Sequence, residues 1–269
     1  MISPYTLRID ELLVQNEVSS YRRVHRLLNT KDVRLNGVPV TSTGTPVNTK
    51  TDILTIDGAV IPLKSHVYLM MNKPQDTVCT DTIGWHSSVF HLVNPQYMPP
   101  NTPAPLHSIG RLDLDTEGLL VLTTDGKLSH RLTDPQNHCS KTYLVYLKNE
   151  CSEQERTEYI QRFNEGLYLP PLKKSAGFTT KSAKLEWTDD SSNPYCTLSG
   201  SRFTTCMLTI TEGKFHQVKR MFAAVGHEVI TLHRCSFGPL QLDPSLSPGS
   251  WRELTAEELT LLRQAAGLG

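Results

Sequence analysis

The segment that most constrains this chain is residues 110–123, where a charged turn bracketed by glycines runs directly into an apolar strand. The turn reads Gly-Arg-Leu-Asp-Leu-Asp-Thr-Glu-Gly, and the strand begins Leu-Leu-Val-Leu. In an extended segment Arg111 and Asp113 point to the same side, because side chains two residues apart share a face. A carboxylate held beside a cation on a rigid element suits a reactive acid. The alternative is a solvated turn in which Asp113, Asp115 and Thr116 bond only to local backbone groups.

The composition allows two domains and argues against several classes of protein. A chain of 269 residues is long enough for two domains or one large one. Its 27 basic and 27 acidic side chains balance, which argues against a uniformly basic nucleic-acid binder but is compatible with local basic patches. The six cysteines show no Cys-x-x-Cys spacing, which predicts free thiols rather than a zinc site or a disulfide framework. Without a signal-like apolar core or a run of roughly 20 apolar residues, we expect a soluble cytoplasmic protein with no membrane partner.

The stretch at residues 59–66 has the composition of a linker. We therefore expect a small domain over residues 5–60, a linker at residues 61–66 and a larger domain over residues 67–266.

Two short helices and a hairpin are expected in the small domain. Apolar residues within Leu7–Leu13 predict a first amphipathic helix. A second helix begins after a cap at Ser19 or Ser20 and carries apolar residues at i, i+3 and i+4. The Asn-Gly pair at residues 36–37 is a strong hairpin signal, and residues 53–56 predict a further strand.

The polar face of the second helix and the segment after it are basic. Over residues 18–36 five Lys and Arg side chains accompany one acid, Asp32, giving a local charge of 5 − 1 = +4. Most charge runs are only solvated faces. Here the acids gather in later helices, and this segregation favours a face that binds phosphates.

The larger domain is expected to contain more strands than helices, without a regular alternation of the two. The expected strands are residues 67–73, 119–123, 142–147, 203–211 and 228–233. Helices are expected after capping boxes at Ser152-x-x-Glu155 and Thr255-x-x-Glu258, and over residues 216–225 before Gly226. Prolines at 95–105 and polar residues at 188–201 predict loops. The pattern favours an α+β domain around a mixed, mostly antiparallel sheet.

The helix expected at residues 216–225 has a core face and an unusual polar edge. The core face comprises Val218, Met221, Phe222 and Val225, which recur at helical spacing. His216, Lys219 and Arg220 form the adjacent stripe. Two cations at the edge of a core face indicate a nearby anion. The alternative is that both side chains extend past the core into water.

Several motifs, in order along the chain, carry a resemblance to one family. They are Gly110-Arg111-Leu112-Asp113, residues 141–145 and residues 212–221, together with Asn72-Lys73-Pro74, Asp125-Gly126 and Leu232-His233-Arg234. In the small domain, Arg8-Ile9-Asp10, the basic second helix and the hairpin at residues 33–37 are similar to the S4 RNA-binding domain. From about Leu7 to Thr255 the chain resembles the S4-containing pseudouridine synthases. It looks closest to the small-subunit branch, which modifies 16S ribosomal RNA.

The resemblance implies an enzyme that isomerises uridine to pseudouridine. The reaction exchanges a C1′–N1 bond for a C1′–C5 bond, with no redox change and no energy input, so no cofactor or metal is implied. The implied partner is 16S ribosomal RNA or a small-subunit assembly intermediate, with uridine 516 as the target. The protein is expected to be a monomer.

The resemblance also implies roles for individual residues. Asp113 is the expected nucleophile, attacking at the sugar or at the base. Tyr143 is expected to stack on uracil and take part in proton transfer at C5, the alternative being an ordinary packed tyrosine. Lys219 is the expected cation partner of Asp113, at a position where many relatives have arginine, and Arg220 is a second candidate.

The remaining expected contacts are with RNA. Arg111 is expected to fill the gap left by the extruded nucleotide, because flipping a base out of its stack costs a few kcal/mol. The other expected RNA-binding residues are Arg22, Arg23, Arg26, Lys31, Arg34, His216 and Arg220. Asp115 is expected only to cap the turn before Gly118.

Three other functions compete with this interpretation. A non-catalytic S4-type ribosome-assembly factor would explain the basic helix of the small domain. It would not explain a charged acid in the larger domain beside a core helix that carries Lys219. A synthase acting on 23S ribosomal RNA would share the same motifs. A metal-dependent phosphotransferase is suggested by Asp113-Leu114-Asp115, but the upstream segment at 105–108 is poorly apolar for the strand that such a site requires.

Overall fold

The computed structural model describes residues 6–16, 18–63, 66–80, 84–95, 104–173, 175–188 and 204–268. Most of the two loops expected at 95–105 and 188–201 falls outside these residues. Within the described part of the chain, no helix combines the length and apolarity that crossing a bilayer requires.

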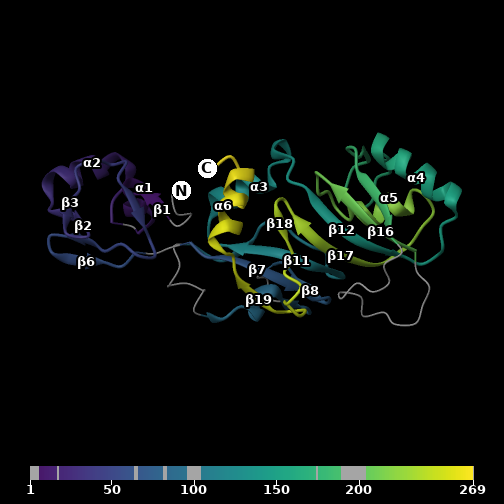
Figure 1. The fold of residues 1–269 in the computed structure, drawn as a ribbon, viewed down its shortest axis with the longest axis horizontal. Helices are drawn as coiled ribbons and strands as arrows, with labels where there is room; N and C mark the ends of the chain where they lie inside the picture. Colours follow the sequence, from purple (N-terminus) through teal and green to yellow (C-terminus); the bar gives the residue numbers. More distant parts are fainter. Residues whose placement is uncertain are drawn as a thin grey trace.

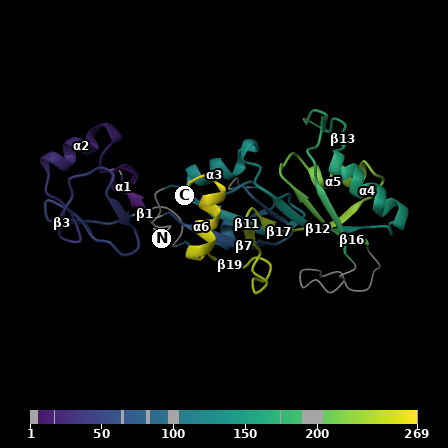
Figure 2. The ribbon, with the colours of Figure 1, turned by 45° about the horizontal axis from the view of Figure 1, so that its top comes forward.

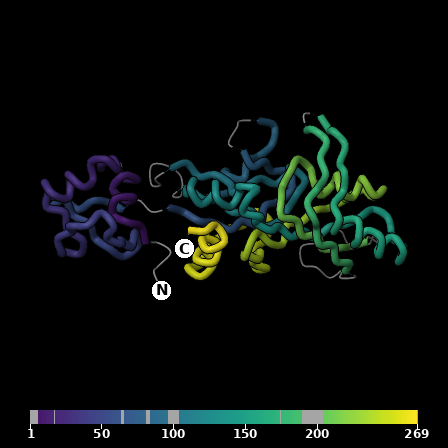
Figure 3. Tube along the Cα trace, turned by 90° about the horizontal axis from the view of Figure 1, so that it is seen from above, coloured from purple at the N-terminus to yellow at the C-terminus, as the bar shows by residue number. Residues whose placement is uncertain are grey.

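The N-terminal residues form a small unit around a hydrophobic cluster of their own, set apart from the rest of the chain (Figures 1 and 3). Its helices are α1 (Ile9–Gln15) and α2 (Tyr21–Thr30). Its strands are β1 (Thr6–Arg8), β2 (Val33–Leu35), β3 (Val38–Pro39), β4 (Pro46–Asn48), β5 (Leu54–Ile56) and β6 (Ala59–Ile61). Asn36 and Gly37 have positive φ angles and turn β2 into β3, as the Asn-Gly pair predicts.

Three details of this unit differ from the sequence-based expectation. Leu7 lies in β1, which pairs with β4, and not in the first helix. Ser20 is at the N-cap position of α2, but its hydroxyl makes no capping hydrogen bond. The stretch expected to be a linker begins with β6, which pairs with β5, because the Asp57-Gly58 turn sends the chain back along that strand.

The rest of the chain is built on one mixed sheet of nine strands. Seven of them follow the order β15-β16-β12-β17-β11-β7-β19, while β10 pairs with β11 and β18 with β17. They are β7 (Tyr68–Lys73), β10 (His107–Ser108), β11 (Thr116–Thr123), β12 (Lys141–Leu147), β15 (Lys184–Thr188), β16 (Thr204–Ile210), β17 (Val229–Phe237), β18 (Leu240–Gln241) and β19 (Trp251–Glu253). Among the strand pairs of this sheet that the structure describes, only β11–β17 is parallel, so the expected α+β class with a mostly antiparallel sheet is confirmed.

Helices and two small ribbons complete this part of the chain. The helices are η1 (Val89–Leu92), α3 (Gly126–Thr133), η3 (Pro135–Asn137), α4 (Glu153–Glu165), α5 (Gln217–Ala223) and α6 (Ala256–Ala265). The ribbons pair β8 (Thr77–Val78) with β9 (Ser87–Ser88) and β13 (Tyr168–Leu169) with β14 (Phe178–Thr179). Both predicted capping boxes are present, at the starts of α4 and α6. Helix α3 was not expected, although its cap is the side chain of Asp125, which accepts from the backbone N–H of Leu128.

Two helical layers cover opposite faces of the sheet (Figures 1 and 2). In β7, Leu69 and Met71 belong to one core cluster, while Tyr68 and Met70 belong to the other. Alternate residues point to opposite faces, so the central strands must be apolar on both. The first cluster contains the buried side chains of α4 and α5, and the second contains those of α3 and α6.

Gly118 is required where the two parallel strands meet. Its φ is +99°, and an added Cβ would lie 2.4 Å from the carbonyl oxygen of Arg234 on β17. Only glycine allows the backbone of β11 to approach its neighbour so closely. This approach fixes the start of β11, which follows directly after the charged turn.

Arg252 on β19 connects this strand to α6 and to the segment between β18 and β19. Its guanidinium donates two hydrogen bonds to Glu258, each 2.8 Å long, and a third to Asp243 at 2.6 Å. The hydroxyl and backbone N–H of Ser245 also donate to Asp243. Hydrogen bonds of this network lower the pKa of both Asp243 and Glu258, so the contribution of the network to stability depends on pH.

Asp243→Asn should make the stability of the protein less sensitive to acid. Hydrogen bonds from Ser245 and Arg252 lower the pKa of Asp243 to about 2, from an ordinary value of 3.8. Because the folded-state pKa is the lower one, this carboxylate stabilises the fold above the ordinary value, and the stabilisation is lost as the pH falls from about 4 to about 2. Urea titrations across that interval should show a smaller decline in unfolding free energy for the variant. Parallel declines would contradict this role.

Candidate active site

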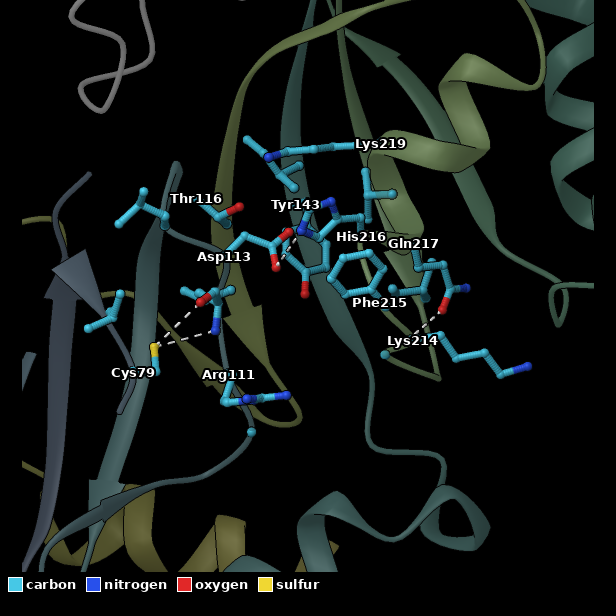
Figure 4. A pocket seen from close by; sticks show the side chains of 18 of the residues that line it. Cys79, Arg111, Asp113, Thr116, Tyr143, Lys214, Phe215, His216, Gln217 and Lys219 are labelled. Atoms are coloured by element: carbon cyan, nitrogen blue, oxygen red, sulfur yellow. Dashed lines mark hydrogen bonds and ion pairs between the residues drawn. The ribbon is translucent and has the colours of Figure 1, made fainter. Parts of the chain in front are cut away.

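A cleft of about 500 Å³ opens on the face of the sheet that carries α4 and α5 (Figure 4). Its volume lies within the roughly 300–1,000 Å³ of small-molecule sites. It is lined by residues 78–80 after β8, residues 110–114 and Thr116 of the charged turn, Tyr143 on β12, residues around α5, and Leu232 on β17. Segments far apart in the sequence therefore meet at one site.

The charged turn has no regular secondary structure between Gly110 and Asp113 and is held by the segment after β7. Cys79 Sγ accepts from the N–H of Leu112 at 3.5 Å and donates to its carbonyl at 3.6 Å. The N–H of Asp76 donates to the carbonyl of Leu114. These contacts fix the backbone on both sides of Asp113.

Lys73 supports the same turn from the interior. Its side chain is fully buried, and its ammonium donates to the carbonyls of Pro74, Leu114 and Thr116 at 3.0, 3.3 and 2.9 Å. Burial lowers the pKa of Lys73 from its ordinary value, and the nearby Cys79 and carboxylates oppose this only in part. The Asn-Lys-Pro motif thus contributes a structural cation beneath the turn, which strand patterning alone did not reveal.

Asp113 points into the cleft toward His216 (Figure 4). About a third of its side chain is exposed, and Oδ1 lies 3.6 Å from Nε2 of His216. His216 occupies the N-cap position of α5 with a φ of +50°, and its ring is stacked on Phe215. The sequence pattern singled out His216 as an RNA contact, and the structure places it beside the carboxylate.

The structure does not show the ion pair between Lys219 and Asp113 that the resemblance implies. The ammonium of Lys219 binds the carboxylate of Asp115 instead. Residues 114 and 115 form a turn closed by a hydrogen bond from the N–H of Thr116 to the carbonyl of Asp113. This turn directs the two carboxylates to different partners, which their spacing in the sequence did not indicate.

Asp115 is therefore an ion-pair partner and not only a cap of the turn. Partial burial opposes its ionisation, but the hydrogen bond and charge of Lys219 outweigh burial and lower the pKa of Asp115. Its side chain is 65% exposed, and that of Lys219 is 23% exposed. The pair lies at the edge of the cleft, where Lys219 is one of the lining residues.

Two further residues expected at the site, Tyr143 and Arg111, do line the cleft (Figure 4). Tyr143 lies in β12 between β16 and β17, opposite Leu208 and Arg234. It is 7% exposed, so neighbouring strands fix its ring against the cleft wall. Arg111 is exposed at the mouth.

Arg220 does not reach the cleft, in contrast to its expected contact with RNA. It is buried, and its guanidinium donates to the carbonyls of Pro170 and Phe215 and to the hydroxyl of Ser175. The guanidinium also lies 4.9 Å from the ring centre of Phe178. Because protein groups occupy its donors, Arg220 anchors the β13–β14 ribbon to α5.

A buried acid holds the loop before α5. Glu212 accepts from the side chain of Gln217 at 2.7 Å and from the N–H of Lys181 at 2.8 Å. Gln217 in turn accepts from the N–H of Lys214. The network fixes the loop that presents Phe215 and His216.

The basic residues expected to bind RNA in the N-terminal unit are exposed. Lys31 pairs with Asp57, and Arg34 pairs with Asp32. Within the described part of the chain, Arg22, Arg23 and Arg26 have no ion-pair partner. Their positive charges therefore have no neighbouring acid among the described residues, in contrast to those of Lys31 and Arg34.

Comparisons with known proteins agree over nearly the whole chain. A family model described as RNA pseudouridylate synthase matches residues 67–224. YtzG of Bacillus subtilis, named as an uncharacterized RNA pseudouridine synthase, is 40% identical over 259 residues, which cover 96% of this chain and 99% of YtzG. The ribosomal small subunit pseudouridine synthase A of Pasteurella multocida is 37% identical over 254 residues, covering 94% and 98% of the two chains.

This chain belongs to the RNA pseudouridylate synthase family. A crystal structure of a pseudouridylate synthase matches the fold of this synthase with a TM-score of 0.60 and 35% sequence identity, covering 95% of this chain and 99% of that one. The expectation that the protein is an RNA pseudouridine synthase, and thus an isomerase, is confirmed.

Lys73→Met should slow pseudouridine formation by this synthase while leaving RNA affinity within about twofold. Loss of the ammonium frees the turn that carries Asp113, and a displacement of about 1 Å at a reacting group costs roughly 100-fold in rate. The check is a single-turnover rate at saturating enzyme together with an RNA titration. Lys148→Met, which removes an exposed ammonium paired with Glu228, is the control and should match the wild type. A wild-type rate for Lys73→Met would contradict the supporting role.

Proposed function

We propose that this synthase converts uridine 516 of 16S ribosomal RNA into pseudouridine, with Asp113 as the nucleophile. The small-subunit assignment is supported by relatives such as the Pasteurella multocida enzyme, which is named for the ribosomal small subunit. The observation that carries the catalytic proposal is the position of Asp113 in a cleft, on a loop braced by Lys73 and Cys79. A carboxylate held in this way can attack an extruded nucleoside without first reorganising.

Asp113 supplies the covalent step. An oxygen of its carboxylate forms a bond at the sugar or the base of the target uridine while the C1′–N1 bond breaks. The detached uracil turns and its C5 bonds to C1′. The bond to Asp113 is released, C5 gives up its proton, and N1 takes up a proton in exchange. No atom is gained or lost, so the product is an isomer of uridine.

Tyr143 and Arg111 hold the nucleoside in this proposal. The buried ring of Tyr143 offers a flat surface for uracil, and its phenol takes part in the proton transfer at C5. Arg111, at the mouth of the cleft, fills the space that the extruded nucleotide leaves in the RNA.

The N-terminal unit acts as an S4-type RNA-binding domain over residues 5–60. Its own hydrophobic core and its exposed cations support this proposal. Arg22, Arg23 and Arg26 on α2 are the cations without an acidic partner among the described residues, so they contact RNA phosphates most directly. Lys31 and Arg34 exchange their acidic partners for phosphates when RNA binds. In this proposal the N-terminal unit contributes to RNA affinity, and the isomerisation takes place in the cleft.

Asp113→Asn should abolish pseudouridine formation in 16S RNA while RNA binding stays within a few-fold of the wild type. An amide is a poor nucleophile but occupies the same space. Asp115→Asn is the matched control, because it makes the same change two residues away in a carboxylate already bound by Lys219. It should keep a rate within roughly 10-fold of the wild type. Activity in Asp113→Asn, or equal loss in both variants, would remove Asp113 from the covalent step.

Neutralising Arg22, Arg23 and Arg26 together to glutamine should weaken RNA binding and flatten its salt dependence. Each lost phosphate contact lowers the slope of log affinity against log salt by about 0.7 for single-stranded RNA, so three contacts give about 2. The control neutralises Lys148, Arg162 and Lys184, which each pair with an acid elsewhere and change the net charge equally. Single-turnover rates at saturating enzyme should be equal in all three proteins. An unchanged slope would argue against α2 as the RNA face.

The target is tested by mapping pseudouridine in ribosomal RNA from cells that lack the gene. The proposal requires loss of the modification at position 516 of 16S RNA. Loss at a site in 23S RNA would favour the large-subunit alternative. Unchanged modification at all sites would favour the non-catalytic assembly factor.

A further inference from the structure

The contact between His216 and Asp113 has the geometry of a positioning interaction. Of the basic side chains in the described residues, His216 is the one within 4.0 Å of the Asp113 carboxylate, at 3.6 Å from Nε2 to Oδ1. Lys219, the cation expected there, is committed to Asp115. Hydrogen bonds of catalytic groups are often this long before the substrate binds and shorten in the reacting complex.

The imidazole of His216 is held more firmly than an exposed histidine would be. Its backbone adopts the left-handed conformation with φ of +50°, and its carbonyl accepts the N–H of Arg220 at 3.0 Å. The buried guanidinium of Arg220 also donates to the carbonyl of Phe215 at 3.3 Å. Both residues before α5 are therefore anchored to the helix.

Phe215 fixes the orientation of the ring. The two ring centres are 3.9 Å apart and the planes differ by 18°, so the rings are stacked. Phe215 is 44% exposed and lines the cleft, although an apolar ring normally gains stability by burial. The ring makes one wall of a slot that confines the imidazole beside Asp113 (Figure 4).

We propose that His216 is a positioning residue for Asp113 and that Phe215 acts through His216 by holding its ring in place. This proposal rests on Asp113 being the nucleophile. An N–H of the imidazole directed at Oδ1 restricts the rotation of the carboxylate and leaves Oδ2 directed at the nucleoside. His216 thereby takes the place at the nucleophile that the resemblance implies for Lys219.

The test compares His216→Ala, His216→Gln, Phe215→Leu and the double variant Phe215→Leu/His216→Ala. Glutamine carries an N–H donor at about the reach of Nε2, so it should restore most of the activity that alanine loses. His216→Ala should lower the single-turnover rate at saturating enzyme by roughly 10- to 100-fold, the effect of a misplaced reacting group. RNA affinity should stay within about twofold.

The double variant separates action through His216 from direct contact with RNA. If Phe215 only holds the imidazole, Phe215→Leu has no further effect once His216 is alanine, so the double variant matches His216→Ala. If Phe215 stacks on a base by itself, the two losses multiply, and the proposal is overturned. A wild-type rate with weakened RNA binding in His216→Ala would also overturn it, because that result places the imidazole on a phosphate.

The thermal unfolding temperature of each variant shows whether a lost activity reflects a lost fold. His216→Gln is the substitution expected to disturb the structure least. Asp113→Asn is measured in the same assay. An inactive Asp113→Asn beside a fully active His216→Ala rejects the positioning role and keeps the nucleophile. An active Asp113→Asn rejects the proposed function itself.

Discussion

The buried ammonium of Lys73 is the interaction on which the loop that carries Asp113 depends. The loop lacks regular secondary structure, so its own hydrogen bonds cannot define the position of Asp113. Lys73 is the last residue of β7, which lies between β11 and β19 in the sheet, and its ammonium donates to the carbonyls of Leu114 and Thr116. A buried charge is unfavourable unless its donors are satisfied, and three carbonyls satisfy this one. The rigid sheet therefore determines where the carboxylate lies.

On the opposite wall of the cleft, a buried acid takes the part that the buried cation Lys73 has on the first wall. There the buried carboxylate of Glu212 organises a loop through Gln217 and the backbone of Lys181. One wall is thus held by a buried cation and the other by a buried anion, each bonded mainly to groups of its own wall. The contacts that cross the cleft, from His216 to Asp113 and from Lys219 to Asp115, are between partly exposed side chains.

Sequence patterns located the elements of this fold better than the contacts between side chains. The strands at β7, β11, β12, β16 and β17 and the helices α4, α5 and α6 were all expected, because apolar periodicity and capping boxes are local signals. Helix α3 was overlooked although Asp125 caps it. At the site, the sequence indicated Asp113, Tyr143, Arg111, His216 and Lys219 as neighbours, and all of them line the cleft. It gave no sign of Cys79, whose thiol matters only because β8 leads it past Leu112.

The partners of Lys219 and Arg220 could not be inferred because both depend on long-range geometry. Arg220 follows Lys219 directly in α5, yet one side chain turns under the β13–β14 ribbon and the other reaches the charged turn. Only the arrangement of the ribbon and the turn around α5 decides this.

The same geometry gives Asp113 and Asp115 different surroundings, although they are two residues apart, and this bears on which of them can act as the proposed nucleophile. Lys219 occupies Asp115, and an ion-paired carboxylate has fewer lone pairs available for attack on a nucleoside. The pair also has little net charge, so Lys219 exerts little net attraction on Asp113 beside it. Asp113 therefore faces the cleft with an imidazole as its nearest basic group. For Asp113 as the proposed nucleophile, orientation then matters more than a neighbouring permanent charge, and orientation is what we propose the stacked ring of His216 to provide.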